Sequence, residues 1–465
     1  MINIILNKKT KTEVVLVFEN KLPEAVKPLK KAKLFNGKSG EIYTDLSVKR
    51  EGVIFLGLGS NKKIDNEELR NAGFKLGKTL VGNKVTRAHI NFKDNKLAKD
   101  LIFHLSEGLL HSNYSFDRYK SKKEENEPTI ELSFVGANKF EHLVTEATNL
   151  VNAVNIAKDF INTPPIDLYP ESYANLIVDL FKGSEVEVEV FDKPQIEALG
   201  MKALLAVASG SDKDPRFVVM KYLPNKEVKE HITFVGKGLT YDSGGYAIKP
   251  ANSMATMHSD MSGSAAVVGA MKAISDNKLP VNVVAVTALT ENLINGSAYK
   301  NGDVVSSMKG TTIEIGNTDA EGRVTLADSI YYAATQLNTT KIVELSTLTG
   351  ACVVALGMEI IGSTTNNERF FKEVKEAGEK AGEMIWQLPV TPSLEKAVKG
   401  EIGDLKNSVA GGAGAITAGI FLEHFAEKKP FVHLDIAGPS WGKPRGYYSN
   451  GATGVGVRTL YELVK

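Results

Sequence analysis

Two glycine-rich segments of the 465-residue sequence gather side chains suited to hold metal ions. The first, at 235–263, reads VGKGLTYDSGGYAIKPANSMATMHSDMSG and carries two lysines and two aspartates. The second, NTDAEGR at 317–323, places an aspartate and a glutamate at positions i and i+2 and then an arginine. In extended backbone the two carboxylates would point the same way, as two ligands of one ion would.

Histidine and cysteine cannot supply most ligands of such a site. The eight histidines form no HxH or HExxH motif, and Cys352 is the single cysteine. Zinc sites made of several thiolates or imidazoles are therefore not expected, and carboxylates would have to hold any metal ion. The single cysteine also excludes an internal disulfide and favours a reducing compartment.

Simpler interpretations of both motifs stay open at this point. Thr318 followed by Glu321 fits a capping box before an apolar helix, and a lysine taken alone is usually a surface residue. The GKG sequence at 236–238 does not match a phosphate-binding loop, so we attribute its glycines to a tight turn at a strand end. Convergence favours chemistry, because four carboxylates, two lysines and an arginine occur in two turns.

Alternating strand-like and helix-like segments would position these side chains. In the first part the patterns predict strands at 13–18, 53–58, 86–92 and 130–135, and helices at 65–81 and 98–111. A helix over 141–161 ends before two prolines, which cannot continue it. In the remainder, strands are predicted at 217–223, 231–236, 281–287, 311–315, 341–346 and 430–436. Helices are predicted there at 264–276, 323–336, 367–382, 415–427 and 457–464.

This order of elements predicts an α/β protein with two domains. Alternating strands and helices form a mainly parallel sheet covered by helices, and the domain junction is expected in the helix at 141–161. Ligands of such sheets bind beyond the carboxyl ends of the strands, where both motifs are predicted to lie.

Composition excludes several classes of function. With 56 Lys+Arg against 55 Asp+Glu the formal net charge is +1, so a strongly basic nucleic-acid-binding protein is not expected. No run of about 18 apolar residues predicts a transmembrane helix. The first residues lack the apolar run and cleavage site of a signal peptide. We therefore expect a cytoplasmic protein that binds neither a membrane nor nucleic acid.

The two motifs resemble the signature of the leucyl aminopeptidase (cytosol aminopeptidase) family of dinuclear-metal exopeptidases. The offsets of 5, 12 and 23 residues from Lys237 to Asp242, Lys249 and Asp260 match that signature. So do NTPPIDLYPE at 162–171, STLTGA at 346–351, HLDIAG at 433–438 and GATGVGVRTL at 451–460. The resemblance covers the chain from about residue 162 onward, whereas the N-terminal part is similar only in general architecture.

The resemblance implies the domain organisation and the site residues. It implies an N-terminal α/β domain (1–140), a linker helix (141–161) and a larger α/β/α catalytic domain with a mixed central sheet (162–465). The metal ligands would be Lys237, Asp242, Asp260, Asp319 and Glu321. Two further residues would be catalytic without binding metal, Lys249 and Arg323. The pocket for the first substrate side chain would be lined by Met257, Thr347, Leu348, Gly350 and Ala437.

The implied enzyme removes N-terminal residues, with Leu or Met types preferred, from peptides that have a free N-terminus. Two divalent ions would activate the attacking water: zinc first, with manganese, magnesium or cobalt as alternatives at the exchangeable site. Bicarbonate held by Arg323 would act as the general base, and six copies would assemble into a homohexamer. Three alternatives stay open: a nucleic-acid-binding regulator, a catalytically silent relative, and another metallohydrolase such as a phosphoesterase.

Overall fold

The computed structural model describes residues 1–62, 64–93, 95–122 and 129–465. Contacts divide the chain into two units, of which the smaller comprises 1–152 and 443–449 and the larger 153–442 and 450–465. The division falls within the long helix α4 (Glu141–Asn162), which was predicted at 141–161. Among the helices of the described residues, none combines the length and apolar character needed to cross a bilayer.

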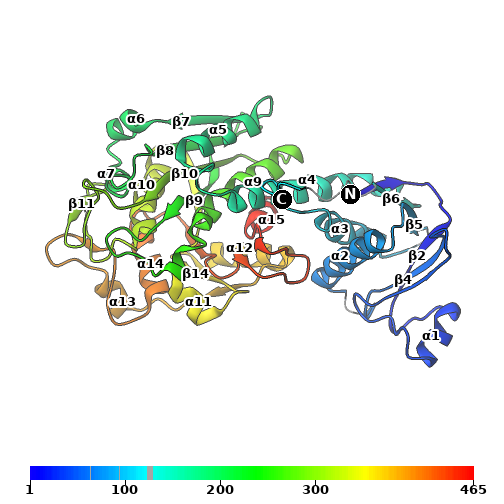
Figure 1. Cartoon of the computed structure of the whole chain (residues 1–465). Helices are drawn as coiled ribbons and strands as arrows, with labels where there is room; N and C mark the ends of the chain where they lie inside the picture. The colour runs from blue at the N-terminus through cyan, green and yellow to red at the C-terminus, as the bar shows by residue number, and fades with distance from the viewer. Residues whose placement is uncertain (63, 94, 123–128) are drawn as a thin grey trace. The chain divides into compact units, whose positions relative to one another are not determined.

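A six-stranded sheet forms the smaller unit (Figure 1). Its order is β1-β6-β5-β2-β4-β3, and only the pair β3–β4 is antiparallel. The strands are β1 (Ile2–Leu6), β2 (Thr12–Val17), β3 (Ile42–Leu46), β4 (Gly52–Gly57), β5 (Arg87–Asn91) and β6 (Ile130–Val135). The helices before α4 are α1 (Lys27–Lys31), α2 (Asn66–Gly82) and α3 (Ala98–His111). The predicted mainly parallel sheet is confirmed, while the two edge strands β1 and β3 were not predicted.

The larger unit is built on an eight-stranded mixed sheet in the order β15-β14-β17-β13-β9-β10-β8-β7. The four central strands, β17, β13, β9 and β10, are mutually parallel, and antiparallel pairs flank them. The strands are β7 (Val186–Phe191), β8 (Arg216–Tyr222), β9 (His231–Asp242), β10 (Val283–Asn292), β13 (Thr339–Ser346), β14 (Ile361–Thr365), β15 (Ile385–Gln387) and β17 (Phe431–Asp435). The mixed central sheet is as expected.

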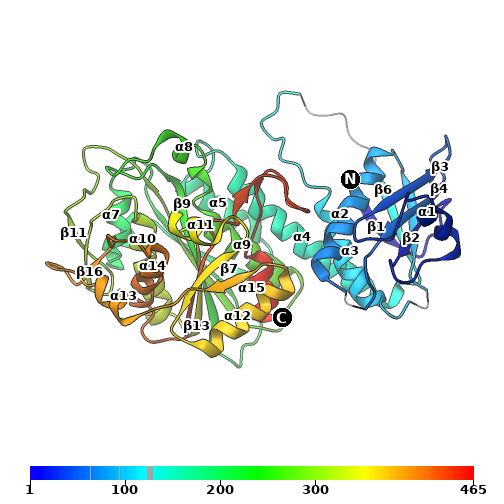
Figure 2. The same cartoon turned by 90° about the horizontal axis from the view of Figure 1, so that it is seen from below.

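Helices cover both faces of this sheet (Figures 1 and 2). One face is covered by α5 (Pro170–Phe181), α9 (Ser262–Asp276), α12 (Glu368–Ala381) and α15 (Val457–Val464). The other face is covered by α7 (Lys202–Ala208), α10 (Glu321–Thr335) and α14 (Gly414–Glu423). Because both faces are covered, the central strands are apolar runs rather than alternating ones, and every residue of β10 is buried.

Shorter elements complete the larger unit. Its remaining helices are α6 (Lys193–Ala198), α8 (Ala251–Met254), α11 (Gly350–Leu356) and α13 (Pro392–Ala397). A small sheet contains β11 (Val304–Ser306), β12 (Thr312–Glu314) and β16 (Leu405–Lys406). A two-stranded pair contains β18 (Trp441–Gly442) and β19 (Gly451–Ala452).

Strand β9 is longer than the sequence predicted. The pattern ended it at residue 236 and assigned the following glycines to a turn, but the strand continues to Asp242. A Cβ at Gly236 would lie 2.6 Å from the main-chain oxygen of Gly263, and one at Gly238 would lie 2.5 Å from that of Ala288. These glycines therefore let α9 and β10 approach the strand closely, and this close approach explains them in place of the predicted turn.

Candidate active site

Polar side chains gather where the four central parallel strands end. Asp242, Asn292 and Asp435 are the last residues of β9, β10 and β17, and Thr347 directly follows β13. Parallel strands bring their carboxyl ends to one edge of the sheet, so positions far apart in sequence meet there. The site therefore lies beyond the carboxyl ends of the strands, as the sequence predicted.

Three carboxylates from the two predicted motifs lie within reach of one ion. Asp242, Asp319 and Glu321 each offer an oxygen, and these oxygens all lie within 4.8 Å of one another. Oε2 of Glu321 is buried and makes no hydrogen bond to any described residue. Burial and the negative charge of Asp242 raise the pKa of Glu321 above its usual value. A divalent cation would relieve this repulsion, so the donor set fits a metal ion.

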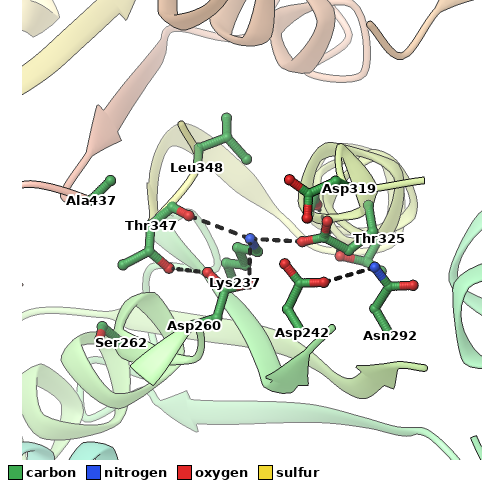
Figure 3. A network of polar contacts seen from close by, with 12 residues as sticks. Lys237, Asp242, Asp260, Ser262, Asn292, Asp319, Thr325, Thr347, Leu348 and Ala437 are labelled. Carbon is green, nitrogen blue, oxygen red and sulfur yellow. Dashed lines mark hydrogen bonds and ion pairs between the residues drawn. The ribbon is translucent and has the colours of Figure 1, made fainter. Parts of the chain in front are cut away.

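Lys237 connects this cluster to Asp260, the fourth predicted carboxylate. Its Nζ lies 2.7 Å from Oδ2 of Asp260 (Figure 3) and 2.9 Å from Oε1 of Glu321. Burial alone would lower the pKa of Lys237, but the carboxylates of Asp260, Glu321 and Asp242 raise it well above its usual value. These ion pairs stabilise the ammonium form, and coordination of a metal would require Lys237 to give up its proton.

Lys249 contacts two other carboxylates of the same cluster. Its Nζ lies 2.8 Å from Oδ2 of Asp242 and 2.5 Å from Oδ1 of Asp319. Burial would lower its pKa, but the neighbouring carboxylates, Asp242 first among them, raise it above the usual value. Lys249 therefore carries a positive charge at neutral pH.

Arg323 supplies a third positive charge from the first turn of α10. The residue is 8% exposed, its Nε makes no hydrogen bond, and no carboxylate among the described residues forms an ion pair with it. Burial lowers the pKa of Arg323 to about 10, so the guanidinium stays charged at neutral pH. A buried cation that forms no ion pair with a described carboxylate is suited to an anionic ligand.

The turn before α10 differs from both patterns considered for it. Asp319 and Glu321 are not in an extended segment, because Glu321 is the first residue of the helix. The capping box does not form either: Oγ1 of Thr318 donates to Gly244 O and accepts from Ala247 N, both at 2.8 Å. Thr318 thus joins the two motifs instead of capping the helix.

All twelve predicted site residues line one cavity of about 540 Å³. Beyond the charged cluster, its walls include Met257, Leu348 and Ala437. Thr347 reaches from the wall into the cluster, where its Oγ1 donates to Oδ1 of Asp260 at 2.7 Å (Figure 3). The cavity therefore has a charged end and a partly apolar wall.

Sequence reasoning missed the polar residues that hold these side chains in place. Nδ2 of Asn292 donates to Oδ1 of Asp242 at 2.7 Å, and Oδ1 of Asn407 accepts from the main-chain nitrogen of Gly316 at 2.9 Å. Oδ1 of Asp435 accepts from the main-chain nitrogens of Leu348 and Ala437. The rule that ligands bind at strand ends could have identified Asn292 and Asp435, since each ends a buried strand.

A carboxylate-rich centre at the carboxyl edge of an α/β sheet is the arrangement of a metal-binding enzyme site. Family models match the chain over most of its length: the catalytic domain of the cytosol aminopeptidase family over residues 155–461, and its N-terminal domain over residues 5–123. The chain belongs to the cytosol aminopeptidase family.

Individual relatives agree with this assignment. A probable cytosol aminopeptidase of Clostridium tetani is 45% identical over 99% of this chain and 98% of its own. A probable cytosol aminopeptidase of Treponema denticola is 44% identical over 98% of both chains. The solved structure of the bottromycin maturation enzyme BotP in complex with Mn has a TM-score of 0.89 at 29% identity, covering 98% of each chain.

Family membership establishes the class of reaction. The protein is an aminopeptidase, a hydrolase that removes residues from the N-terminus of peptides in a metal-dependent reaction.

Proposed function

We propose that the enzyme hydrolyses the first peptide bond with two divalent ions held by Lys237, Asp242, Asp260, Asp319 and Glu321. The observation that carries this proposal is the convergence of four carboxylates and a lysine from two separate segments at the carboxyl edge of the sheet. Asp242 and Glu321 offer oxygens within 4.8 Å of each other and of Asp319, and Glu321 also contacts Lys237, so these two carboxylates would suit ligands shared by both ions. The structurally similar enzyme BotP was solved in complex with Mn, which is consistent with a divalent ion here.

The ions would supply what the side chains cannot: an activated water at neutral pH and an anchor for a free α-amine. The chain's own contribution is charge placed around the reacting carbonyl group. Lys249 carries its positive charge into the cavity and would stabilise the oxyanion that forms on this group. One such donor contributes roughly 2.7–4 kcal/mol to the transition state.

Arg323 would hold bicarbonate as the general base. Its guanidinium lines the cavity, its Nε makes no hydrogen bond to a described residue, and the negative charges of Glu321 and Asp435 act on it without forming an ion pair. No histidine among the described residues lines the cavity, and the carboxylates that line it are metal ligands in this scheme. An external base bound by Arg323 is consistent with both observations.

The first side chain of the substrate would lie against Met257, Thr347, Leu348, Gly350 and Ala437. All five line the cavity, and the apolar members favour leucine or methionine. A methylene group more or less changes such a preference by only about 1–3 kcal/mol. The preference is therefore expected to be graded rather than absolute.

Three properties are proposed by analogy with the family. The native ions would be zinc, with manganese, magnesium or cobalt at the exchangeable site. The chain would assemble as a homohexamer and act in the cytoplasm on peptides with a free N-terminus.

The decisive experiment compares matched peptides with free and acetylated N-termini. The enzyme is freed of metal by chelation and assayed before and after addition of Zn²⁺ or Mn²⁺. We expect activity to return with metal, on free peptides only, and most strongly on those that begin with Leu or Met. Equal cleavage of acetylated peptides would contradict a site that anchors the free amine.

The same assay separates the alternatives. A phosphoesterase would cleave p-nitrophenyl phosphate and ignore the peptides, and a silent relative would turn over neither substrate. Nucleic-acid binding that persists after metal removal and weakens steeply with salt would support the alternative of a nucleic-acid-binding regulator. The near-neutral net charge of +1 does not favour it.

A further inference from the structure

One buried amide joins the two segments that carry the proposed metal ligands. Nδ2 of Asn292 donates to Oδ1 of Asp242 at 2.7 Å (Figure 3) and to the main-chain oxygen of Thr318 at 3.0 Å. Thr318 directly precedes Asp319. Asn292 therefore links the end of β9 to the turn before α10, although its own strand, β10, supplies no proposed ligand.

The chemistry of the partners sets the orientation of this amide. A carboxylate and a carbonyl oxygen can only accept, so the NH2 group of Asn292 must face Asp242 and Thr318. The residue is fully buried. Its main-chain oxygen also accepts from the nitrogen of Ser243 at 2.9 Å and from its hydroxyl at 2.8 Å. Asn292 is thus held at both ends beside Asp242.

These contacts determine which oxygen of Asp242 faces the charged cluster. Oδ1 accepts from Asn292 and also from the main-chain nitrogen of Gly244, at 2.9 Å. Oδ2 instead meets Lys249, whose Nζ also contacts Asp319. Two N–H donors on one side of the carboxylate stop it from rotating, so its other oxygen points toward the remaining acidic groups.

A second residue offers a matched control. The hydroxyl of Tyr299 donates to the same main-chain oxygen of Thr318, at 2.9 Å. Tyr299 is buried, and its single hydroxyl hydrogen is donated to Thr318 rather than to Asp242. Removing its hydroxyl would loosen the turn before α10 to a similar degree and leave Asp242 oriented.

We propose that Asn292 is a positioning residue for the metal centre, which aims the Asp242 carboxylate. This inference rests on the proposed function, since it requires Asp242 to be a metal ligand. Residues that orient ligands by hydrogen bonding typically change metal affinity by about 10- to 100-fold when they are replaced.

The test measures Mn²⁺ affinity by isothermal titration calorimetry on the full chain after chelation. The variants are Asn292→Ala, Asn292→Asp and Tyr299→Phe. Asn292→Asp keeps the side-chain volume but removes both donors and adds negative charge beside Asp242. We expect both Asn292 variants to bind Mn²⁺ about 10- to 100-fold more weakly, and Tyr299→Phe to stay within about twofold of the wild type.

Circular dichroism of the metal-free variants establishes whether they are folded. Wild-type affinity in a folded Asn292 variant overturns the inference, and so does an equal loss in Tyr299→Phe. Failure of both Asn292 variants to fold would assign the residue to the fold and likewise overturn it. A wild-type chain that binds no Mn²⁺ would instead contradict the proposed function.

Discussion

At the scale of single residues, the three positively charged side chains of the site differ in their contacts with its carboxylates. Lys237 and Lys249 each contact two carboxylates of the cluster, while Arg323 has no such partner among the described residues. The three cations thus have different environments in one cavity. Their different environments match the different roles proposed for them: ligand, oxyanion partner and anion holder.

Replacing Lys249 with alanine tests the proposed oxyanion role. We expect Lys249→Ala to lower kcat by about 100-fold or more, because one charged donor to the transition state is lost. Metal content should be retained, since the residue is not a proposed ligand. Steady-state kinetics and elemental analysis measure the two quantities. Lys272→Ala, which removes a lysine paired with Asp276 on α9, is the control and should leave kcat unchanged.

At the scale of elements, the start of α10 fits closely against β9. A Cβ on Gly322 would lie 2.4 Å from Cε and 2.6 Å from Nζ of Lys237. The helix also carries Asp328, whose two oxygens accept from the main-chain nitrogens of Leu204 in α7 and Met308. One helix therefore both positions the site and joins neighbouring segments of the core.

Gly322→Ala should disturb the metal site while sparing the fold. The added methyl group meets the flexible end of Lys237 rather than backbone, so that side chain would move away from Asp260 and Glu321. We expect metal affinity to fall by about tenfold or more, measured by calorimetry, with little change in melting temperature. Gly82→Ala, where nothing lies within 4 Å of the new methyl group, should change neither quantity.

The buried carboxyl group of Asp328 should make the stability of the protein depend on pH. Burial raises its pKa from 3.8 to about 7, against the opposing effect of its backbone hydrogen bonds. The folded chain then holds a proton that the unfolded chain releases above about pH 4. The free energy of unfolding should therefore fall as the pH rises from about 4 to about 7, by about 4 kcal/mol at most.

An asparagine at position 328 isolates this contribution. Asp328→Asn cannot ionise, so its stability should lack the component that Asp328 adds between about pH 4 and pH 7. Urea denaturation of both proteins at pH 5 and pH 8 measures the difference. We expect the stability of the wild type relative to the variant to drop by about 2–3 kcal/mol. Parallel pH profiles would show that Asp328 is ionised throughout.

At the scale of the whole molecule, the smaller unit is not a continuous stretch of chain. Residues 443–449 follow β18 of the larger unit but belong to the smaller one. Within that unit Tyr447 is buried, its ring stacks on His111 at 4.9 Å, and its hydroxyl donates to Oε2 of Glu67 at 3.1 Å. This last bond joins residues 380 positions apart.

Tyr447→Ala should destabilise the smaller unit. Loss of a buried aromatic ring typically costs about 3–5 kcal/mol. We expect faster hydrogen exchange in α2 and α3, which carry Glu67 and His111, measured by mass spectrometry. Tyr447→Phe keeps the ring and loses one hydrogen bond, so its effect should be nearer 1 kcal/mol. Unchanged exchange in the alanine variant would show that residues 443–449 do not stabilise this unit.

Local patterns in the sequence predicted most of the inner strands, several of the longer helices and the chemical inventory, but they missed β7, β14 and β15 at the two ends of the larger sheet. Apolar periodicity and proline positions located the inner strands and the long helix α4, because these signals are local. The spacing of Lys237, Asp242, Lys249 and Asp260, together with NTDAEGR, indicated the family for the same reason.

Only the tertiary structure decided how these parts meet. Three features join positions that are far apart in the chain. They are the convergence of Asp242 with Asp319 and Glu321, the amide of Asn292 between two segments, and the assignment of residues 443–449 to the smaller unit. Such contacts depend on strand order and on close approach at glycines such as Gly236, which no local pattern encodes. Local propensity specifies the elements, whereas burial and packing between distant segments specify the site.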